Sequence, residues 1–342
     1  MNMNLDPGII DSSEELFENN IRPKNLQEFI GQDRLVENLM VFVKSSLIQQ
    51  RPLPHILFYG PPGLGKTTLS RILANEMRVN IKVTSGPILD KQGDIAAILS
   101  SLEDNDILFI DEIHRLKTNI EEMLYPAMEE FEIDIVMGSG LGASTLRLPL
   151  KKFTLIGATT KAGNLTSPLR GRFGYEDRLD FYDIPSIKKI LLRTAELLKI
   201  MLQDELAEYL AHRCRGTPRI ANRLLSRIKD FATVYSKGAI KRKIIDQALD
   251  SMQIDNLGLD KMDRLILNVM IENFNGGPVG IDTISISIGE DKRTVEEVFE
   301  PFLIKMGLIS RTSRGRIVTK LAYEHLKKEN RFYARQKSLF ES

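Results

Sequence analysis

The chain of 342 residues has no tryptophan and a single cysteine, Cys214. One cysteine excludes an intramolecular disulfide and a cysteine-rich zinc site, and it is typical of a reducing compartment. No apolar run approaches the ~18 residues that a membrane-spanning helix needs. The first twenty residues carry five acidic side chains and no lysine or arginine, the opposite of a signal peptide. We therefore expect a soluble cytoplasmic protein without membrane contact.

The bulk composition indicates an ordinary globular protein of two or three domains, at about 150 residues per domain. Hydrophobic residues make up 42% and charged residues 27%, and the net charge is only +1. The charge is nevertheless uneven, because Lys305–Ser342 holds ten lysines or arginines against three acids. A solvated helical tail and a nucleic-acid contact both explain such a run.

The first 182 residues alternate short apolar runs with helical stretches. Four runs predict strands: Ile56–Tyr59, Ile81–Thr84, Ile107–Ile110 and Phe153–Gly157. Uninterrupted apolar strands separated by helices are typical of a parallel sheet covered on both faces. We predict an α/β domain over residues 1–182.

The remainder of the chain predicts two smaller domains. Residues 183–253 show only helical periodicity and predict a small all-α domain. Residues 254–342 contain three short helical segments and then a hairpin, Leu308–Thr319, that turns at Ser313–Gly315.

A phosphate-binding loop is the strongest motif. Gly60–Thr67 reads GPPGLGKT, and it follows a predicted strand and precedes a helical run. The glycines allow backbone N–H groups to surround a phosphate, while Lys66 reaches the β- and γ-phosphates. Thr67 is expected to place its hydroxyl on Mg²⁺. A nucleoside triphosphate with magnesium, ATP above all, is the predicted ligand.

Two acids follow the third predicted strand, at the sheet edge where the loop also lies. We predict that Asp111 holds the hydrated Mg²⁺ and that Glu112 orients and deprotonates the attacking water. For the nearby His114 we favour packing or hydrogen bonding over catalysis. Thr159 ends the fourth strand and is a weaker candidate for a place beside the γ-phosphate.

Three arginines suggest anion contacts. Arg170 and Arg172 have no partner within their own motif, and an arginine offered to a neighbouring subunit's nucleotide stabilises transition-state charge. Surface exposure explains them equally well. Thr217 and Pro218 predict a helix start. Arg219 then stands in a first turn that disfavours cations, which points to an external anion such as the nucleotide.

Together these motifs resemble the AAA+ ATPases and, within them, the RuvB family of bacterial Holliday junction branch-migration motors. The resemblance spans roughly Ile21–Leu326, and its narrower signatures are the segment around His114 and two late motifs. The stretches that carry it are Ile21–Lys24, Gly31–Gln32, Gly60–Thr67, Thr84–Pro87, Leu108–Leu116, Leu124–Glu129, Gly157–Thr160, Ser167–Phe173, Gly216–Leu225, Gly276–Gly280 and Arg311–Arg316.

The resemblance implies a large P-loop AAA+ ATPase domain, a small helical lid (183–253) and a C-terminal winged-helix domain (254–342) in a hexameric ring on duplex DNA. It implies branch migration of four-way junctions in recombination and repair. Arg172 is then the arginine finger, with Arg170 as the alternative. The nucleotide-contacting positions that it implies are Ile21, Arg22, Gly63, Gly65, Lys66, Thr67, Thr68, Glu129, Glu130, Phe131, Arg172, Tyr182 and Arg219.

The resemblance also implies partners. The segment Phe131–Leu150 matches the family's β-hairpin that docks on the junction-binding protein RuvA, and a junction resolvase is a further possible partner in a larger complex. Its alternating apolar residues independently predict a hairpin with one apolar face. That face either binds the partner or is tucked into the core.

If Leu308–Thr319 is a wing, its arginines lie where they reach DNA phosphates, and two basic residues of the preceding helix join them. The predicted DNA contacts are Lys292, Arg293, Arg311, Arg314 and Arg316. The chain departs from the family at Gly171, where an acid is expected, and at Tyr175, where an aliphatic is expected. The glycine predicts a looser finger loop.

Two other functions fit the same motifs. A nucleotide-dependent DNA-binding switch would remodel or recruit proteins without translocating. A protein unfoldase usually carries an aromatic pore loop, and Ile88–Asp94 has no aromatic residue, which disfavours it.

Overall fold

A computed structural model describes residues 18, 20–137 and 144–328. Most of the acidic N-terminal segment, the hairpin tip 138–143 and the basic tail after Lys328 lie outside these residues. The chain divides at residue 190 into two compact units, which are described separately. No helix in the described ranges is long and apolar enough to cross a membrane.

The larger unit contains a five-stranded parallel sheet in the order β2-β3-β6-β1-β7. Its inner strands are buried over nearly their full length, as apolar runs in a parallel sheet must be. The α/β prediction is confirmed, and one polar edge strand, β7, had not been predicted. The bounds are β1 (Ile56–Tyr59), β2 (Ile81–Ser85), β3 (Ile107–Asp111), β6 (Thr154–Thr159) and β7 (Tyr175–Arg178).

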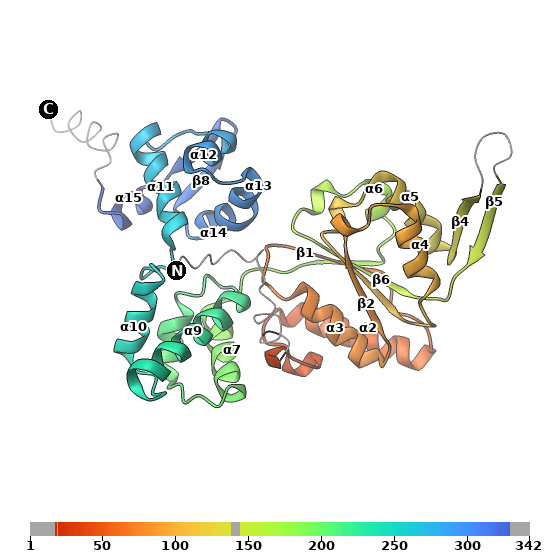
Figure 1. The fold of residues 1–342 in the computed structure, drawn as a ribbon, viewed down its shortest axis with the longest axis horizontal. Coiled ribbons are helices and arrows are strands. Elements are labelled where there is room, and N and C mark those ends of the chain that lie inside the picture. The colour runs from red at the N-terminus through yellow and green to blue at the C-terminus, as the bar shows by residue number, and fades with distance from the viewer. Residues whose placement is uncertain (1–17, 19, 138–143, 329–342) are drawn as a thin grey trace. The chain divides into compact units, whose positions relative to one another are not determined.

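Helices cover both faces of this sheet, with α2 and α3 on one side and α4, α5 and α6 on the other (Figure 1). The α4–α5 layer and the sheet enclose a continuous apolar core that includes Leu108, Ile110 and Phe153. The helices are α2 (Asp33–Gln49), α3 (Lys66–Met77), α4 (Gln92–Ser100), α5 (Thr118–Glu129) and α6 (Ser167–Arg170), with single turns η1 (Leu26–Glu28), η2 (Gly86–Ile88), η3 (Ile113–Arg115) and η5 (Ala162–Asn164).

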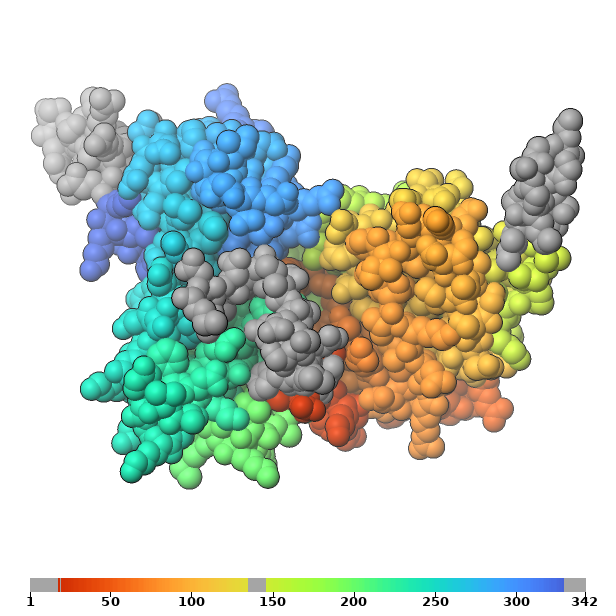
Figure 2. Space-filling model, in the orientation of Figure 1, coloured from red at the N-terminus to blue at the C-terminus, as the bar shows by residue number. Residues whose placement is uncertain are grey.

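The predicted hairpin is confirmed as β4 (Glu132–Met137) and β5 (Ser144–Pro149), paired antiparallel. It stands at the edge of the larger unit, yellow-green in Figure 2. Its base is tucked in, because Ile133 is fully buried and the opposite Leu148 packs on the same core. Farther out, Leu146 is 46% exposed.

The second unit begins with the predicted helical lid. Leu210, Leu224 and Ile245 form part of its core, and the single cysteine, Cys214, is buried beside them. The helices are α7 (Ile184–Leu197), which starts in the larger unit, α8 (Asp204–Ala211), α9 (Pro218–Ser236) and α10 (Arg242–Ser251).

The last segment has its own apolar core and is a winged helix, with helices followed by a two-stranded wing. The wing turns at Ser313–Arg314, within the predicted turn Ser313–Gly315, and Gly315 already belongs to the second strand. Its elements are α11 (Lys261–Phe274), α12 (Ile281–Ile288), α13 (Lys292–Thr294), the π-helical turn η6 (Val295–Phe299), α14 (Glu300–Lys305), β8 (Ile309–Thr312), β9 (Gly315–Val318) and α15 (Lys320–His325).

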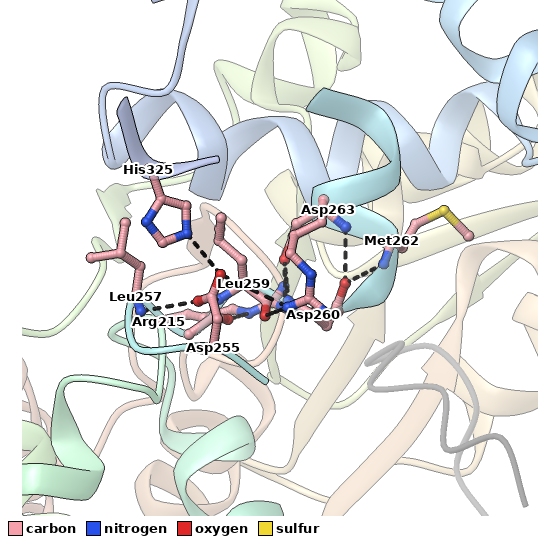
Figure 3. A network of polar contacts seen from close by, with 10 residues as sticks. Arg215, Asp255, Leu257, Leu259, Asp260, Met262, Asp263 and His325 are labelled. Carbon is pink, nitrogen blue, oxygen red and sulfur yellow. Dashed lines mark hydrogen bonds and ion pairs between the residues drawn. The ribbon is translucent and has the colours of Figure 1, made fainter. Parts of the chain in front are cut away.

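A buried ionic network joins the lid to the winged helix within the second unit (Figure 3). Arg215 of the lid, only 5% exposed in its side chain, lies 2.7 Å from Asp260 and 2.6 Å from Asp263. Asp260 caps α11 by accepting from the N–H groups of Met262 and Asp263. From the other side, His325 of α15 lies 2.8 Å from Asp255. We call Arg215, Asp255, Asp260, Asp263 and His325 the junction network.

Candidate nucleotide-hydrolysis site

The P-loop follows β1 directly and ends in the first turn of α3. Gly60, Gly63 and Gly65 have φ angles of 136°, 78° and 107°. These values lie in the region that side-chain-bearing residues rarely adopt, so the glycines are what lets the backbone curl into a phosphate cradle. Lys66 begins α3, and its Nζ donates to the carbonyls of Gly60 and Pro61 at 2.7 and 2.9 Å. The ammonium is thereby held at the loop.

Two aromatic side chains, Tyr182 and Phe29, pack against the P-loop. The hydroxyl of Tyr182 donates to the carbonyl of Leu64 at 3.1 Å, and burial raises the pKa of this phenol. A Cβ on Gly31 would lie 2.8 Å from the Tyr182 ring, and one on Gly65 would lie 3.1 Å from Phe29. The structure therefore brings Tyr182 to the P-loop, as the resemblance implied.

Strand order places the predicted acids on the same edge as the P-loop. β6 lies between β1 and β3, and all three are parallel, so the residues after each strand share one end of the sheet. Asp111 ends β3 and its Oδ1 accepts from the Glu112 N–H at 2.9 Å. Glu112 itself has a φ of 50°, a left-handed conformation, and its side chain is 32% exposed.

Thr159 is fully buried at the end of β6, between these two groups. Its carbonyl accepts from the P-loop Gly60 N–H at 3.1 Å. Its hydroxyl lies 2.8 Å from Nδ1 of His114 and accepts from the Lys161 N–H at 2.9 Å. The Thr159 hydroxyl thus contacts His114, and its place beside the γ-phosphate stays a prediction.

These residues fit a magnesium nucleotide. The loop offers N–H groups in a glycine-dependent curve, α3 offers its N-terminus, and Thr67 and Thr68 stand in its first turn. Hydroxyl and carboxylate oxygens are the ligands that Mg²⁺ prefers, and it commonly uses one or two of them together with phosphate oxygens and water. Thr67 and Asp111 meet that need. The residues described contain no group of three or more His, Cys, Asp or Glu side chains that could hold a metal by themselves.

The two candidate finger arginines have different partners. Arg170 makes a two-pronged contact with Glu176 of β7, at 2.8 and 2.9 Å. Arg172 lies 3.2 Å from Glu129 and over the ring of Tyr125, and its side chain is 22% exposed.

The intervening Gly171 has an ordinary helical φ of −65°, with only normal contacts for an added Cβ. Nothing in its backbone requires glycine. The other departure, Tyr175, donates to Asp177 at 2.6 Å and packs on Phe42, and burial raises its pKa to about 12.

Three of the implied nucleotide contacts, Glu129, Glu130 and Phe131, lie apart from the P-loop of the same chain. Phe131 packs on His55 and Phe153, beside the amino-terminal ends of β1 and β6, whereas the P-loop is at the carboxyl ends. Glu129 and Glu130 end α5 and are exposed. These three residues therefore cannot contact the nucleotide held by their own P-loop.

At the N-terminal side of the domain, Ile21 is buried and Arg22 pairs with Glu18 at 3.3 Å. In the lid, α9 begins at Pro218 with Thr217 in the N-cap position, as predicted. The Thr217 side chain makes no capping bond, and Arg219 stands in the first turn.

One predicted DNA contact is wrong. Arg316 is buried, and it makes a two-pronged contact with Glu300 at 2.6 and 3.0 Å because β9 alternates and turns this side chain inward. Arg311 and Arg314 are exposed on the wing, and Arg293 is exposed on α13. Lys292 is exposed but pairs with Asp282 at 2.7 Å.

Models of three domains match the chain in sequence order. Residues 21–179 match the model described as "Holliday junction DNA helicase RuvB P-loop domain". Residues 182–255 match the RuvB AAA lid domain, and residues 256–327 match the RuvB C-terminal winged helix domain. The chain belongs to the RuvB family. It is therefore a P-loop ATPase that binds nucleotide.

Individual RuvB proteins agree with this assignment. The Holliday junction branch migration complex subunit RuvB of Fusobacterium nucleatum is 53% identical over 308 residues, which cover 90% of this chain and 93% of that protein. The solved structure of the Thermotoga maritima RuvB Holliday junction branch migration motor is 47% identical, with a TM-score of 0.84 over 91% of this chain and 99% of that one. A P216G variant of the same protein, in its own numbering, has a TM-score of 0.85 and 48% identity.

Proposed function

We propose that this RuvB-family chain is the ATP-driven motor that moves Holliday junctions in recombination and repair, working on duplex DNA with a junction-binding partner. One observation carries the proposal: a complete P-loop and strand-end acid pair share a single chain with a lid and a winged helix, in the domain order of RuvB. We assign 1–182, 183–253 and 254–342 to these three domains, and the matched ranges support that division.

The chemistry follows from the residues at the strand ends. Lys66 and the loop amides bind the β- and γ-phosphates, and Thr67 and Asp111 hold Mg²⁺, which neutralises charge on the transferred phosphoryl group when bound. Glu112 takes a proton from the attacking water. Its partial exposure supports this role, because the water must reach the carboxylate.

The site is completed by a neighbouring subunit in a hexameric ring. Arg172 is the arginine finger in this proposal, because its contacts to Glu129, Tyr125 and the Pro168 carbonyl, the last at 2.7 Å, lie near the surface, where an incoming phosphate can replace the Glu129 carboxylate. Glu129, Glu130 and Phe131 then face a neighbour's nucleotide rather than their own. The resemblance assigns the adenine and lid contacts of this proposal to Ile21, Arg22, Tyr182 and Arg219.

The exposed arginines of the wing, Arg311 and Arg314, contact DNA phosphates in this proposal, together with Arg293. Arg316 instead supports the wing from inside through Glu300. Contacts of this kind position a protein without reading sequence, which suits a motor that must pass over any base pair.

The outer part of the β4–β5 hairpin is the docking site for a RuvA-like partner. Leu146 is exposed there, while Ile133 and Leu148 root the hairpin in the core. A junction resolvase is a further member of the larger complex in this proposal.

Branch migration tests the proposal directly. A synthetic four-way junction, a RuvA-type junction-binding protein and ATP are combined with the wild-type chain or with Glu112→Gln. We expect strand exchange with the wild type, and ATP binding without turnover or exchange with Glu112→Gln. Glu122→Gln, on the exposed side of α5, is the matched control and should behave as wild type. ATP consumption without any strand exchange by the wild type would instead indicate a switch or remodelling protein.

A further inference from the structure

A path of polar contacts, two hydrogen bonds and one ion-pair contact, runs from the P-loop to Glu112 across three strand ends. Gly60 of the P-loop donates to the Thr159 carbonyl, and the Thr159 hydroxyl lies 2.8 Å from Nδ1 of His114. The other ring nitrogen, Nε2, lies 3.5 Å from Oε2 of Glu112. The His114 side chain is only 7% exposed, so the ring is fixed between Thr159 and Glu112.

The chemistry of the groups sets the direction of these contacts. An ionised carboxylate can only accept, so the hydrogen of the His114–Glu112 contact belongs to Nε2 of His114. A neutral imidazole then has an unprotonated Nδ1, which accepts from the Thr159 hydroxyl. Thr159 Oγ1 already accepts from the Lys161 N–H, which leaves its hydrogen to donate toward His114. From the Thr159 hydroxyl onward, the donors of the path therefore point toward Glu112.

Glu112 is a residue whose side chain needs such support. Its left-handed φ of 50° is unfavourable for a residue with a side chain, by about 1–2 kcal/mol. Its backbone is also closely packed, because a Cβ on Gly86 would lie 2.5 Å from the Glu112 carbonyl oxygen. The backbone is thus held from one side, and His114 holds the carboxylate from the other.

We propose that His114 is a positioning residue for ATP hydrolysis, which couples the P-loop, through Thr159, to the direction of the Glu112 carboxylate. The inference rests on the proposed role of Glu112 and extends it. A misplacement of about 1 Å at a reacting group can cost on the order of 100-fold in rate, so an indirect residue of this kind has a measurable effect.

Steady-state ATP hydrolysis by the full-length chain tests the path in two halves. His114→Ala should lower kcat by about 10- to 100-fold while changing KM for ATP less than about threefold. His114→Gln can place an amide N–H near the Nε2 position and should retain more activity than His114→Asn, which reaches only the Nδ1 position. Thr159→Val removes the hydroxyl at nearly constant volume and should lower kcat, whereas Thr159→Ser should restore it.

Non-additivity is the sharpest readout. Because both substitutions interrupt one path, His114→Ala combined with Thr159→Val should be no slower than His114→Ala alone. Multiplied effects in the double variant would overturn the proposal. So would equal activities of the Gln, Asn and Ala variants, since these would indicate packing rather than hydrogen bonding.

A matched control separates positioning from stability. His55 is a partly buried histidine beside this sheet, bonded to the Met128 carbonyl and the Leu155 N–H at the opposite end of the strands. His55→Gln should lower the melting temperature without lowering kcat. If Glu112→Gln still hydrolyses ATP, the role of Glu112 fails, and His114 has no catalytic group to position. If Glu112→Gln is inactive but His114→Ala keeps wild-type kcat, only the His114 path fails.

Discussion

The arginine segment after β6 and the lid–winged-helix junction both hold an arginine against carboxylates, in opposite surroundings. Arg172 has one carboxylate, at 3.2 Å, and a side chain that is 22% exposed. Arg215 has two, at 2.7 and 2.6 Å, and a side chain that is 5% exposed. Near the surface, an arginine can exchange a single carboxylate partner for a phosphate, whereas an arginine buried between two aspartates is needed for the fold.

Removal of Arg172, the arginine with the exchangeable partner, should have the largest effect, and the effect should be on the rate of ATP hydrolysis rather than on stability. Arg172→Ala is expected to lower ATP turnover by about 10³- to 10⁵-fold, the range for arginine fingers, with nucleotide binding and melting temperature nearly unchanged. Arg170→Ala, which breaks only the exposed pair with Glu176, should cost less than about tenfold.

Mixed rings test whether Arg172 acts on a neighbour. Arg172→Ala and Lys66→Ala are each inactive alone in our prediction. Mixing them should restore part of the activity, because some interfaces then join an intact loop to an intact finger. Mixtures that stay inactive would argue against shared sites.

Removal of Arg215, the buried arginine, should instead lower the stability of the fold. At pH 8, Arg215→Ala leaves Asp260 and Asp263 close together and uncompensated, and we expect a loss of about 3–5 kcal/mol in unfolding free energy. Hydrogen exchange of α9 and α11 measures it, since both should lose protection together. Arg227→Ala, an exposed pair with Asp230 on α9, should change stability by less than about 0.5 kcal/mol. Protection lost only in α9 would contradict the view that Arg215 joins the two domains.

Per pH unit, the smallest expected effect is a pH dependence of the junction network. Burial raises the pKa of Asp263 to about 7 despite the opposing charge of Arg215, and Oδ1 of Asp263 has no hydrogen-bond partner among the residues described. The folded protein therefore keeps this proton at pH values where the unfolded chain, with a pKa near 3.8, has released it. Stability should then fall as pH rises from about 4 to 7, by at most about 1.4 kcal/mol per unit, and level off above 7.

Asp263→Asn is the test of that dependence, because asparagine does not titrate. The unfolding free energy of α11 is measured by hydrogen exchange at pH 5, 6, 7 and 8. The advantage of the wild type over the variant should shrink, or change sign, as pH rises. Parallel curves for the two proteins would show that Asp263 is ionised throughout this range.

The sequence predicted the parts of the fold that have a one-dimensional signature. Buried parallel strands are continuous apolar runs, so β1 and β3 were predicted correctly. The P-loop was also predicted correctly, because a glycine-rich loop between a strand and a helix is typical of phosphate binding. β7 has no such signature, because Tyr175–Arg178 is a polar edge strand with only alternate residues turned inward.

The functional residues that were assigned wrongly or overlooked share one physical cause. A sequence shows which residues carry charge, but it does not show which of them are buried in the fold. Arg316 resembles the other wing arginines until its inward direction on β9 is known. A signal was present, because Glu296 and Glu300 lie one helical turn apart and both approach it. The pairs Arg215–Asp260 and His114–Thr159 were not predicted, because the two members of each pair are 45 residues apart in the chain.

The hairpin has a mechanical consequence that follows from its root. Glu129, which holds Arg172, ends α5, and β4 starts three residues later with Ile133 already in the core. The base of the hairpin is thus joined directly to the core of the ATPase domain, through Ile133 and Leu148. Under the proposed roles of the hairpin and of Arg172, we expect partner binding to be coupled to ATP hydrolysis through the few residues of chain between β4 and Glu129.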